Sequence, residues 1–111
     1  MHDTSSNTSR ITVPTGGGGK YLFGAATAFA ANATGSRFFY LQVNGATIFV
    51  DSVIQANTTG GDATMQALVG VWAMVAADYA EHYVIQSSGG ALNVSSAASY
   101  TPEFWAFWFR T

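Results

Sequence analysis

Histidines and carboxylates are the side chains of this chain that could take part in acid–base chemistry, and they are few. The two histidines are His2 and His82, and the six carboxylates are Asp3, Asp51, Asp62, Asp78, Glu81 and Glu103. Nucleophilic catalysis needs a base beside the nucleophile, and glycoside hydrolysis needs two carboxyl groups across a sugar-binding cleft. The carboxylates are scattered over several turns, and Ser and Thr are so abundant that closeness to His82 would mean little. We therefore expect no enzyme.

The same groups offer no obvious ion site. Calcium loops use closely spaced acidic ligands, and no Asp-rich run is present. We expect His82 to be a partly buried strand residue or to pack near an oligomer axis, with ion binding by symmetry copies of His82 as the alternative. Asp78 is expected to fix a turn by accepting hydrogen bonds from backbone N–H groups. No metal and no cofactor are predicted.

The glycine run Gly16–Gly19 before Lys20 invites comparison with a phosphate-binding loop. That motif needs a glycine six positions before the lysine and a Ser or Thr directly after it. Pro14 and Tyr21 occupy these two positions. A flexible loop is therefore expected.

Composition excludes further classes of function. Charged residues make up 9% of the chain, against about 25% in ordinary soluble domains, while apolar residues make up 49%. The net charge is −2, and no Lys or Arg lies between Arg37 and Arg110, so no cationic patch is available for nucleic acid. Cysteine is absent, which removes disulfides and Cys–zinc sites. So few charges predict a surface of Ser, Thr, Asn, Gln and Gly, with a large fraction inside an interface.

The chain is predicted to be one domain with a short tail. Residues 1–10 are polar and lack the apolar core of a secretion signal, so we expect a flexible tail there and a domain over residues 11–111. The longest apolar run, residues 67–77, is well short of the roughly 20 residues that span a bilayer. No membrane insertion is expected, and an extracellular location would require export by a route other than a signal peptide.

Alternating apolar residues and turn signals predict an all-β fold. Strands are expected over residues 11–13, 21–31, 37–43, 46–50, 53–56, 67–77, 79–86, 91–94 and 104–109. Asn44-Gly45 is a strong hairpin signal. Residues 67–77 fit a strand buried on both faces better than a helix, although Ala, Leu and Met favour a helix. This pattern predicts a two-sheet antiparallel jelly-roll sandwich.

The aromatic segment Phe104–Phe109 is apolar on both faces. Phe104, Ala106 and Trp108 alternate with Trp105, Phe107 and Phe109. One set can pack on the core of the domain, and covering the other most simply requires a neighbouring copy of the chain. In residues 21–31, the face made of Gly24 and alanines is small enough for another backbone to approach.

Several motifs resemble the globular head of complement C1q, the jelly roll shared with tumour necrosis factor. They are Gly19-Lys20-Tyr21-Leu22-Phe23, Asn44-Gly45, Ala77-Asp78-Tyr79 and Phe104-Trp105-Ala106-Phe107. Three further segments look like the C1q-like tips of bacteriophage tail fibres: Ile11-Thr12-Val13-Pro14, Phe29-Ala30-Ala31-Asn32-Ala33-Thr34-Gly35-Ser36-Arg37 and Gln86-Ser87-Ser88-Gly89-Gly90-Ala91-Leu92-Asn93-Val94. The sequence departs from the family pattern at Val13, Ala25, Ala77, His82, Trp105 and Trp108.

The resemblance implies a compact homotrimer that binds a host cell-surface ligand, such as polysaccharide, as the head of a phage tail fibre or similar appendage on the virion. The predicted interface or core residues are Tyr21, Phe23, Tyr83, Ile85, Trp105, Phe107 and Phe109. The predicted ligand-contact loops carry Asn32, Thr34, Ser36, Asn57, Thr58, Thr59, Asp62, Ser87 and Ser88. A purely structural trimerisation cap is the alternative, and a polysaccharide depolymerase is a third hypothesis. For the aromatic side chains, including Trp72, a sugar-stacking platform is the alternative to packing.

Overall fold

The computed structural model describes residues 10–56, 63–95 and 102–109, and this part of the chain is built of β-strands. The strands are β1 (Arg10–Thr12), β2 (Gly19–Phe29), β3 (Ser36–Val43), β4 (Thr47–Gln55), β5 (Thr64–Met74), β6 (Tyr79–Gln86), β7 (Val94–Ser95) and β8 (Glu103–Trp108). Within these ranges no helix is long and apolar enough to cross a membrane. The predicted tail, residues 1–10, lies outside the description except for Arg10.

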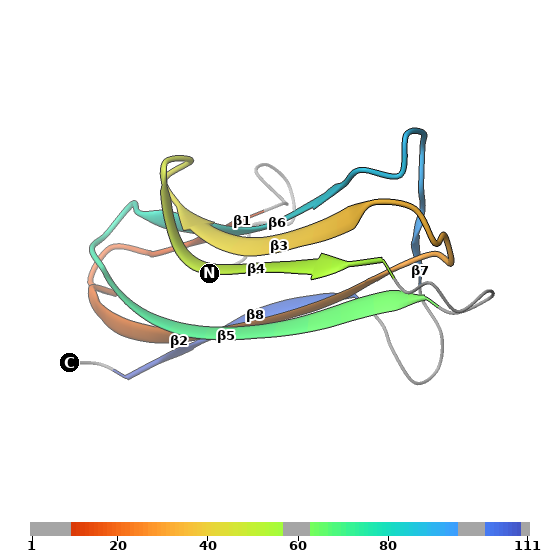
Figure 1. Ribbon diagram of the computed structural model, residues 1–111. Coiled ribbons are helices and arrows are strands. Elements are labelled where there is room, and N and C mark those ends of the chain that lie inside the picture. Colours follow the sequence, from red (N-terminus) through yellow and green to blue (C-terminus); the bar gives the residue numbers. More distant parts are fainter. Residues whose placement is uncertain (1–9, 57–62, 96–101, 110–111) are drawn as a thin grey trace.

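The strands form two antiparallel sheets that lie in two layers (Figure 1). Sheet A has the order β1-β6-β3-β4. Sheet B is centred on β2, which pairs with β5 along one edge and with β8 and β7 along the other. The predicted all-β architecture of two antiparallel sheets is confirmed.

The core lies between the sheets because each strand turns one set of alternate side chains inward. From sheet B, Tyr21 and Phe23 are fully buried, and from sheet A so are Phe39 and Leu41. The rings contact across the layers: the centroids of Phe23 and Phe49 lie 5.4 Å apart. Gly24, which belongs to the small-residue face predicted for residues 21–31, lies on the opposite face of β2 from Tyr21 and Phe23.

Two turns at one end of the sandwich are joined by side chains. Asn44 and Gly45 both have positive φ, 55° and 69°, as a type I′ hairpin turn requires. Asp78 accepts hydrogen bonds from the Val75 N–H at 3.0 Å and from the Asn44 side-chain amide at 2.9 Å. These bonds stabilise the carboxylate and lower the pKa of Asp78. The predicted hairpin and the predicted turn-fixing role of Asp78 are both confirmed.

Ala77 offers a test of this turn, since its φ of 75° lies in the left-handed region that favours glycine. We expect Ala77→Gly to raise the free energy of unfolding by about 0.5–1 kcal/mol, because relief of the backbone strain exceeds the added entropy of the unfolded chain. Urea unfolding at a fixed protein concentration measures the difference. A variant less stable than the parent would show that the turn carries no such strain.

Three strand predictions need correction. Residues 91–94 were expected to be a strand, but of these only Val94 belongs to one, β7. Residues 46–50 and 53–56 were expected to be separate strands, but they belong to the single strand β4. The polar pair Asp51 and Ser52 does not end the strand, because both residues pair with β3. The segment 67–77 was expected to be a strand buried on both faces. A strand is present, but β5 spans Thr64–Met74 and residues 75–77 lie in the following turn. The strand is not buried on both faces, since Val69 and Val71 are exposed.

Candidate functional site

The surface of sheet B that faces away from the core is almost wholly apolar. Leu22 lies between Val71 of β5 and Phe107 of β8, and the next row holds Val69, Gly24 and Trp105. We call this surface the sheet B outer face, and its apolar residues are Leu22, Met65, Val69, Val71, Trp105, Phe107 and Phe109. Its polar side chains, Lys20 and Glu103, belong to rows at either end of the paired region.

This face is large enough to matter for assembly. Apart from the half-buried Leu22, its residues are between 41% (Trp105) and 64% (Val69) exposed. At roughly 150–200 Å² for a complete side chain, they leave on the order of 500 Å² of apolar surface open. That is near the upper end for monomers, whose largest patches cover about 300–600 Å². It also matches the apolar share of a standard interface, which takes about 800 Å² from each partner.

The small side chains of β2 were expected to let a second backbone approach closely. At Gly24 the space is filled by a side chain instead. The Trp105 indole lies across Gly24, and a Cβ added at Gly24 would be 2.1 Å from a ring carbon. Glycine at position 24 therefore makes room for an indole of the same chain. The ring is held against the sheet while 41% of the residue remains exposed.

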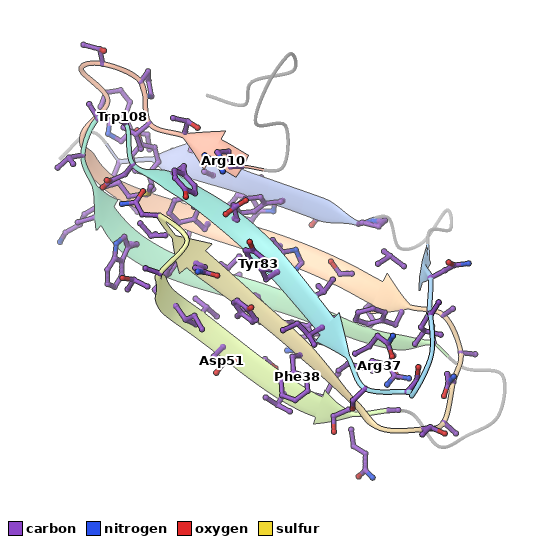
Figure 2. All side chains as sticks on the ribbon, turned by 90° about the horizontal axis from the view of Figure 1, so that it is seen from above. Arg10, Arg37, Phe38, Asp51, Tyr83 and Trp108 are labelled. Atoms are coloured by element: carbon purple, nitrogen blue, oxygen red, sulfur yellow. The ribbon has the colours of Figure 1, made fainter. Side chains whose placement is uncertain are left out.

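The outward surface of sheet A combines rings with polar groups. One row across the sheet holds Asp51, Tyr40 and Tyr83, and the next holds Val53, Phe38 and Ile85. We call these six residues the sheet A outer face. Figure 2 shows Asp51, Phe38 and Tyr83 on the adjoining strands β4, β3 and β6.

The two tyrosines of the sheet A outer face form a stacked pair. Their ring centroids are 5.4 Å apart and their planes differ by 8°. Nearer β1, on the same side of the sheet, the Arg10 guanidinium lies 3.7 Å from the centre of the Tyr79 ring, and Arg10 is paired in register with Glu81. Within the part of the chain that the structure describes, Asp51 has no hydrogen-bond or ion-pair partner and is exposed.

At the opposite end of the sandwich from the Asn44 and Asp78 turns, a buried arginine organises the loop between β2 and β3 (Figure 2). The Arg37 side chain is fully buried and donates hydrogen bonds to the carbonyl oxygens of Asn32 at 2.8 Å and Thr34 at 2.9 Å. Its guanidinium carbon lies 5.8 Å from the centre of the Phe29 ring. Arg37 therefore fixes the course of this loop from within.

Two of the three predicted contact loops, residues 32–36 and 87–90, meet at that end. Ser36 N–H donates to the Ser87 hydroxyl at 2.9 Å, and Ala56 N–H donates to the Gly35 carbonyl at 2.9 Å, so the end of β4 reaches the same place. Many polar groups here are already paired within the chain: Asn32 Oδ1 accepts from Thr34 N–H, and the Ser88 hydroxyl donates to the Gly90 carbonyl. Asn57, Thr58, Thr59 and Asp62 lie outside the described residues.

His82 lies between the sheets. Its Nδ1 is 3.4 Å from the Thr27 hydroxyl and its ring centroid is 6.3 Å from that of Phe104. Its Nε2 has no hydrogen-bond partner among the described residues, and burial lowers the pKa of the imidazole. The partly buried position expected for His82 is confirmed, and neither outer face presents the ring to symmetry copies.

Acid should therefore destabilise the protein through His82. Because the folded-state pKa lies below the unfolded value of about 6.5, the unfolded chain binds the proton more readily. We expect the contribution to be fully present above about pH 6.5 and to be lost as the pH falls toward the folded-state pKa. Thermal unfolding of the parent and of His82→Leu between pH 8 and 5 tests this, because other titrating groups cancel in the difference. Parallel pH profiles would rule it out.

The residues predicted for interface or core are divided among three places. Tyr21 and Phe23 are in the core, Tyr83 and Ile85 are on the sheet A outer face, and Trp105, Phe107 and Phe109 are on the sheet B outer face. The sequence interpretation missed Met65, Val69 and Val71, although their alternation along β5 was visible in the sequence. It also missed Phe38, Tyr40 and Asp51, which become neighbours of Tyr83 and Ile85 only by pairing of β3 with β4 and β6.

No protein-family model and no curated protein matches the chain. Among residues 10–56, 63–95 and 102–109, no group of three or more His, Asp or Glu side chains is arranged to hold a metal ion. Among the described residues, the two outer faces are the candidate binding surfaces.

Proposed function

We propose that this chain is a homotrimeric, non-enzymatic head domain of a phage tail fibre or similar adhesive appendage, which attaches to a ligand on a host cell surface. The observation that carries the proposal is the sheet B outer face. Its open apolar surface matches the apolar share of what one partner contributes to a standard interface, and it has few polar groups to interact with water. A second and a third copy of the chain can cover this face without any other kind of molecule.

The number three comes from the resemblance of the sequence motifs to C1q-like heads. The arrangement of the strands is consistent with it, since β8 and β2, which carry two of those motifs, pair side by side in sheet B. Three copies that meet through this face would close around an axis, and sheet A of each copy would point outward. Each copy would then present the same ligand site, so three weak contacts would act together on a repetitive surface.

A structural cap without a ligand is the second candidate. It is favoured by the internal hydrogen bonds of Asn32, Ser87 and Ser88, which leave the described contact loops with fewer free polar groups than a ligand-binding loop would offer. In that case the trimer would align the three chains of a fibre and close its end, and a different part of the appendage would bind the host.

The first test is the mass of the protein in solution. Light scattering at micromolar concentration is expected to give three times the 11.7 kDa of one chain. A monomer would contradict the proposed assembly and the adhesive function that depends on it. A trimer that binds no host polysaccharide and no host cell would favour the cap.

A further inference from the structure

The sheet A outer face differs in chemistry from the sheet B outer face. Sheet B presents aliphatic and aromatic groups with charges only in its end rows, as suits contact with a copy of itself. On sheet A, the stacked pair Tyr40 and Tyr83 adjoins the exposed carboxylate of Asp51, and Phe38, Val53 and Ile85 form the next row. Rings beside hydrogen-bonding groups suit a ligand that has both C–H faces and hydroxyl groups.

We propose that the sheet A outer face binds a neutral saccharide, with the sugar packed on the rings of Tyr83 and Phe38 and its hydroxyl groups donating to Asp51. This inference rests on the proposed function and names both the site and the ligand class. It places the ligand on the flat side of the sandwich, where the row of Phe38 and Ile85 is followed by Ser36 and Ser87 at the start of the loops.

The dimensions of the face fit such a ligand. The two rows are two residues apart along each strand, which is about 7 Å, and each row crosses three strands, which is about 10 Å. That area accommodates a sugar ring and part of its neighbour. The exposed fractions of 40% for Tyr83, 47% for Ile85 and 54% for Val53 show that the surface is open in the single chain.

The charge on the face selects among saccharides. Asp51 is exposed and has no partner among the described residues, whereas Arg10 is occupied by the Tyr79 ring and lies beside Glu81. An unpaired carboxylate accepts hydrogen bonds from hydroxyl groups and repels anionic groups. A neutral sugar therefore fits better than a uronic or sialic acid.

A further copy of the chain is a poorer occupant for this face. A closed trimer on the sheet B outer face leaves sheet A on its outside, and self-association through a second face would join trimers into an open lattice instead of a closed particle. The site therefore stays accessible in the proposed assembly, and three copies of it face the surroundings.

The test uses the full chain and affinity electrophoresis through gels that contain dextran, mannan or galactan, with polygalacturonate as the anionic probe. The parent is expected to be retarded by at least one neutral polysaccharide and not by polygalacturonate. Tyr83→Ala should weaken this binding at least tenfold and Asp51→Asn several-fold, while the matched variant Tyr83→Phe keeps the ring and most of the binding. All variants should retain the mass of the parent.

The remaining outcomes separate this site from the proposed function. Binding that survives Tyr83→Ala but is lost in the loop variant Ser88→Ala would overturn the sheet A site and leave the adhesive role standing. Retardation by polygalacturonate alone would also overturn the sheet A site. Choline serves as a cationic probe. If choline raises the thermal stability and no neutral polysaccharide binds, the face is a cation site and not a saccharide site. A parent trimer that binds none of the probes would count against both the site and the adhesive role.

Discussion

Phe107→Asp is expected to convert the trimer into a folded monomer at micromolar concentration. Phe107 is 59% exposed on the sheet B outer face and packs edge-on against Phe109, with ring centroids 5.7 Å apart. In an assembled interface the substitution removes an aromatic anchor and buries a carboxylate in a row whose other members, Leu22 and Val71, are apolar. We expect a loss of about 2–4 kcal/mol per interface, which weakens each contact by about 30-fold to 1,000-fold.

The experiment is light scattering of the variant beside circular dichroism, which shows whether the strands remain. Val53→Asp is the matched control, because it puts the same charge at a similarly exposed apolar position on the sheet A outer face. The control is expected to keep the trimer mass. If Phe107→Asp also keeps it, or if Val53→Asp alone dissociates the protein, the assembly does not use the sheet B outer face.

Arg37→Met is expected to lower the free energy of unfolding by about 3 kcal/mol. The methionine retains apolar packing against Phe29, but the carbonyl oxygens of Asn32 and Thr34 lose the guanidinium that pairs with them. A fully buried polar group left without a partner costs about 1–3 kcal/mol, and these two hydrogen bonds are part-buried. The total is a large share of the 5–15 kcal/mol by which domains are stable.

Urea unfolding at one fixed protein concentration measures this loss, and hydrogen exchange shows whether the loop of residues 30–36 opens first. Arg37→Lys is the control, since it keeps the charge but replaces the planar fork with a single ammonium group, and we expect it to lose about half as much stability. A change of less than about 0.5 kcal/mol in Arg37→Met would mean that the loop does not depend on the arginine.

Both variants bear on ligand binding as well as on stability. Phe107→Asp should leave the sheet A outer face unchanged in each chain, so a monomer should still bind a neutral saccharide, but without the gain from three sites acting together. Arg37→Met loosens the loops at the end of the sandwich and leaves Tyr40 and Tyr83 stacked on the sheet. The pair of variants therefore distinguishes a ligand site on the sheet from one on the loops.

Local sequence determined most of the strands and the two sets of alternate side chains along each of them. Alternation in residues 104–109 separated Phe104, Ala106 and Trp108 from Trp105, Phe107 and Phe109, but it did not say which set faces the core. The pairing of β2 with β8 decided that point, because it sets Trp108 beside the buried Tyr21. The Asn44-Gly45 hairpin and the Asp78 turn were predictable from local sequence, since both depend on positive φ or on hydrogen bonds over a few residues. Such features need no knowledge of distant segments.

Only the tertiary structure decided which outer surfaces exist. The pairing of β2 with β8 sets Leu22 beside Phe107, and the pairing of β3 with β6 sets Tyr40 beside Tyr83, at sequence separations that no local pattern encodes. Arginine is a residue type usually found at the surface. Arg37 is nevertheless buried, because three backbone carbonyl groups accept hydrogen bonds from its guanidinium. The apolar pattern of a strand indicates that one of its faces must be covered. The pairing of the strands determines which residues lie beside that face and whether the face remains exposed.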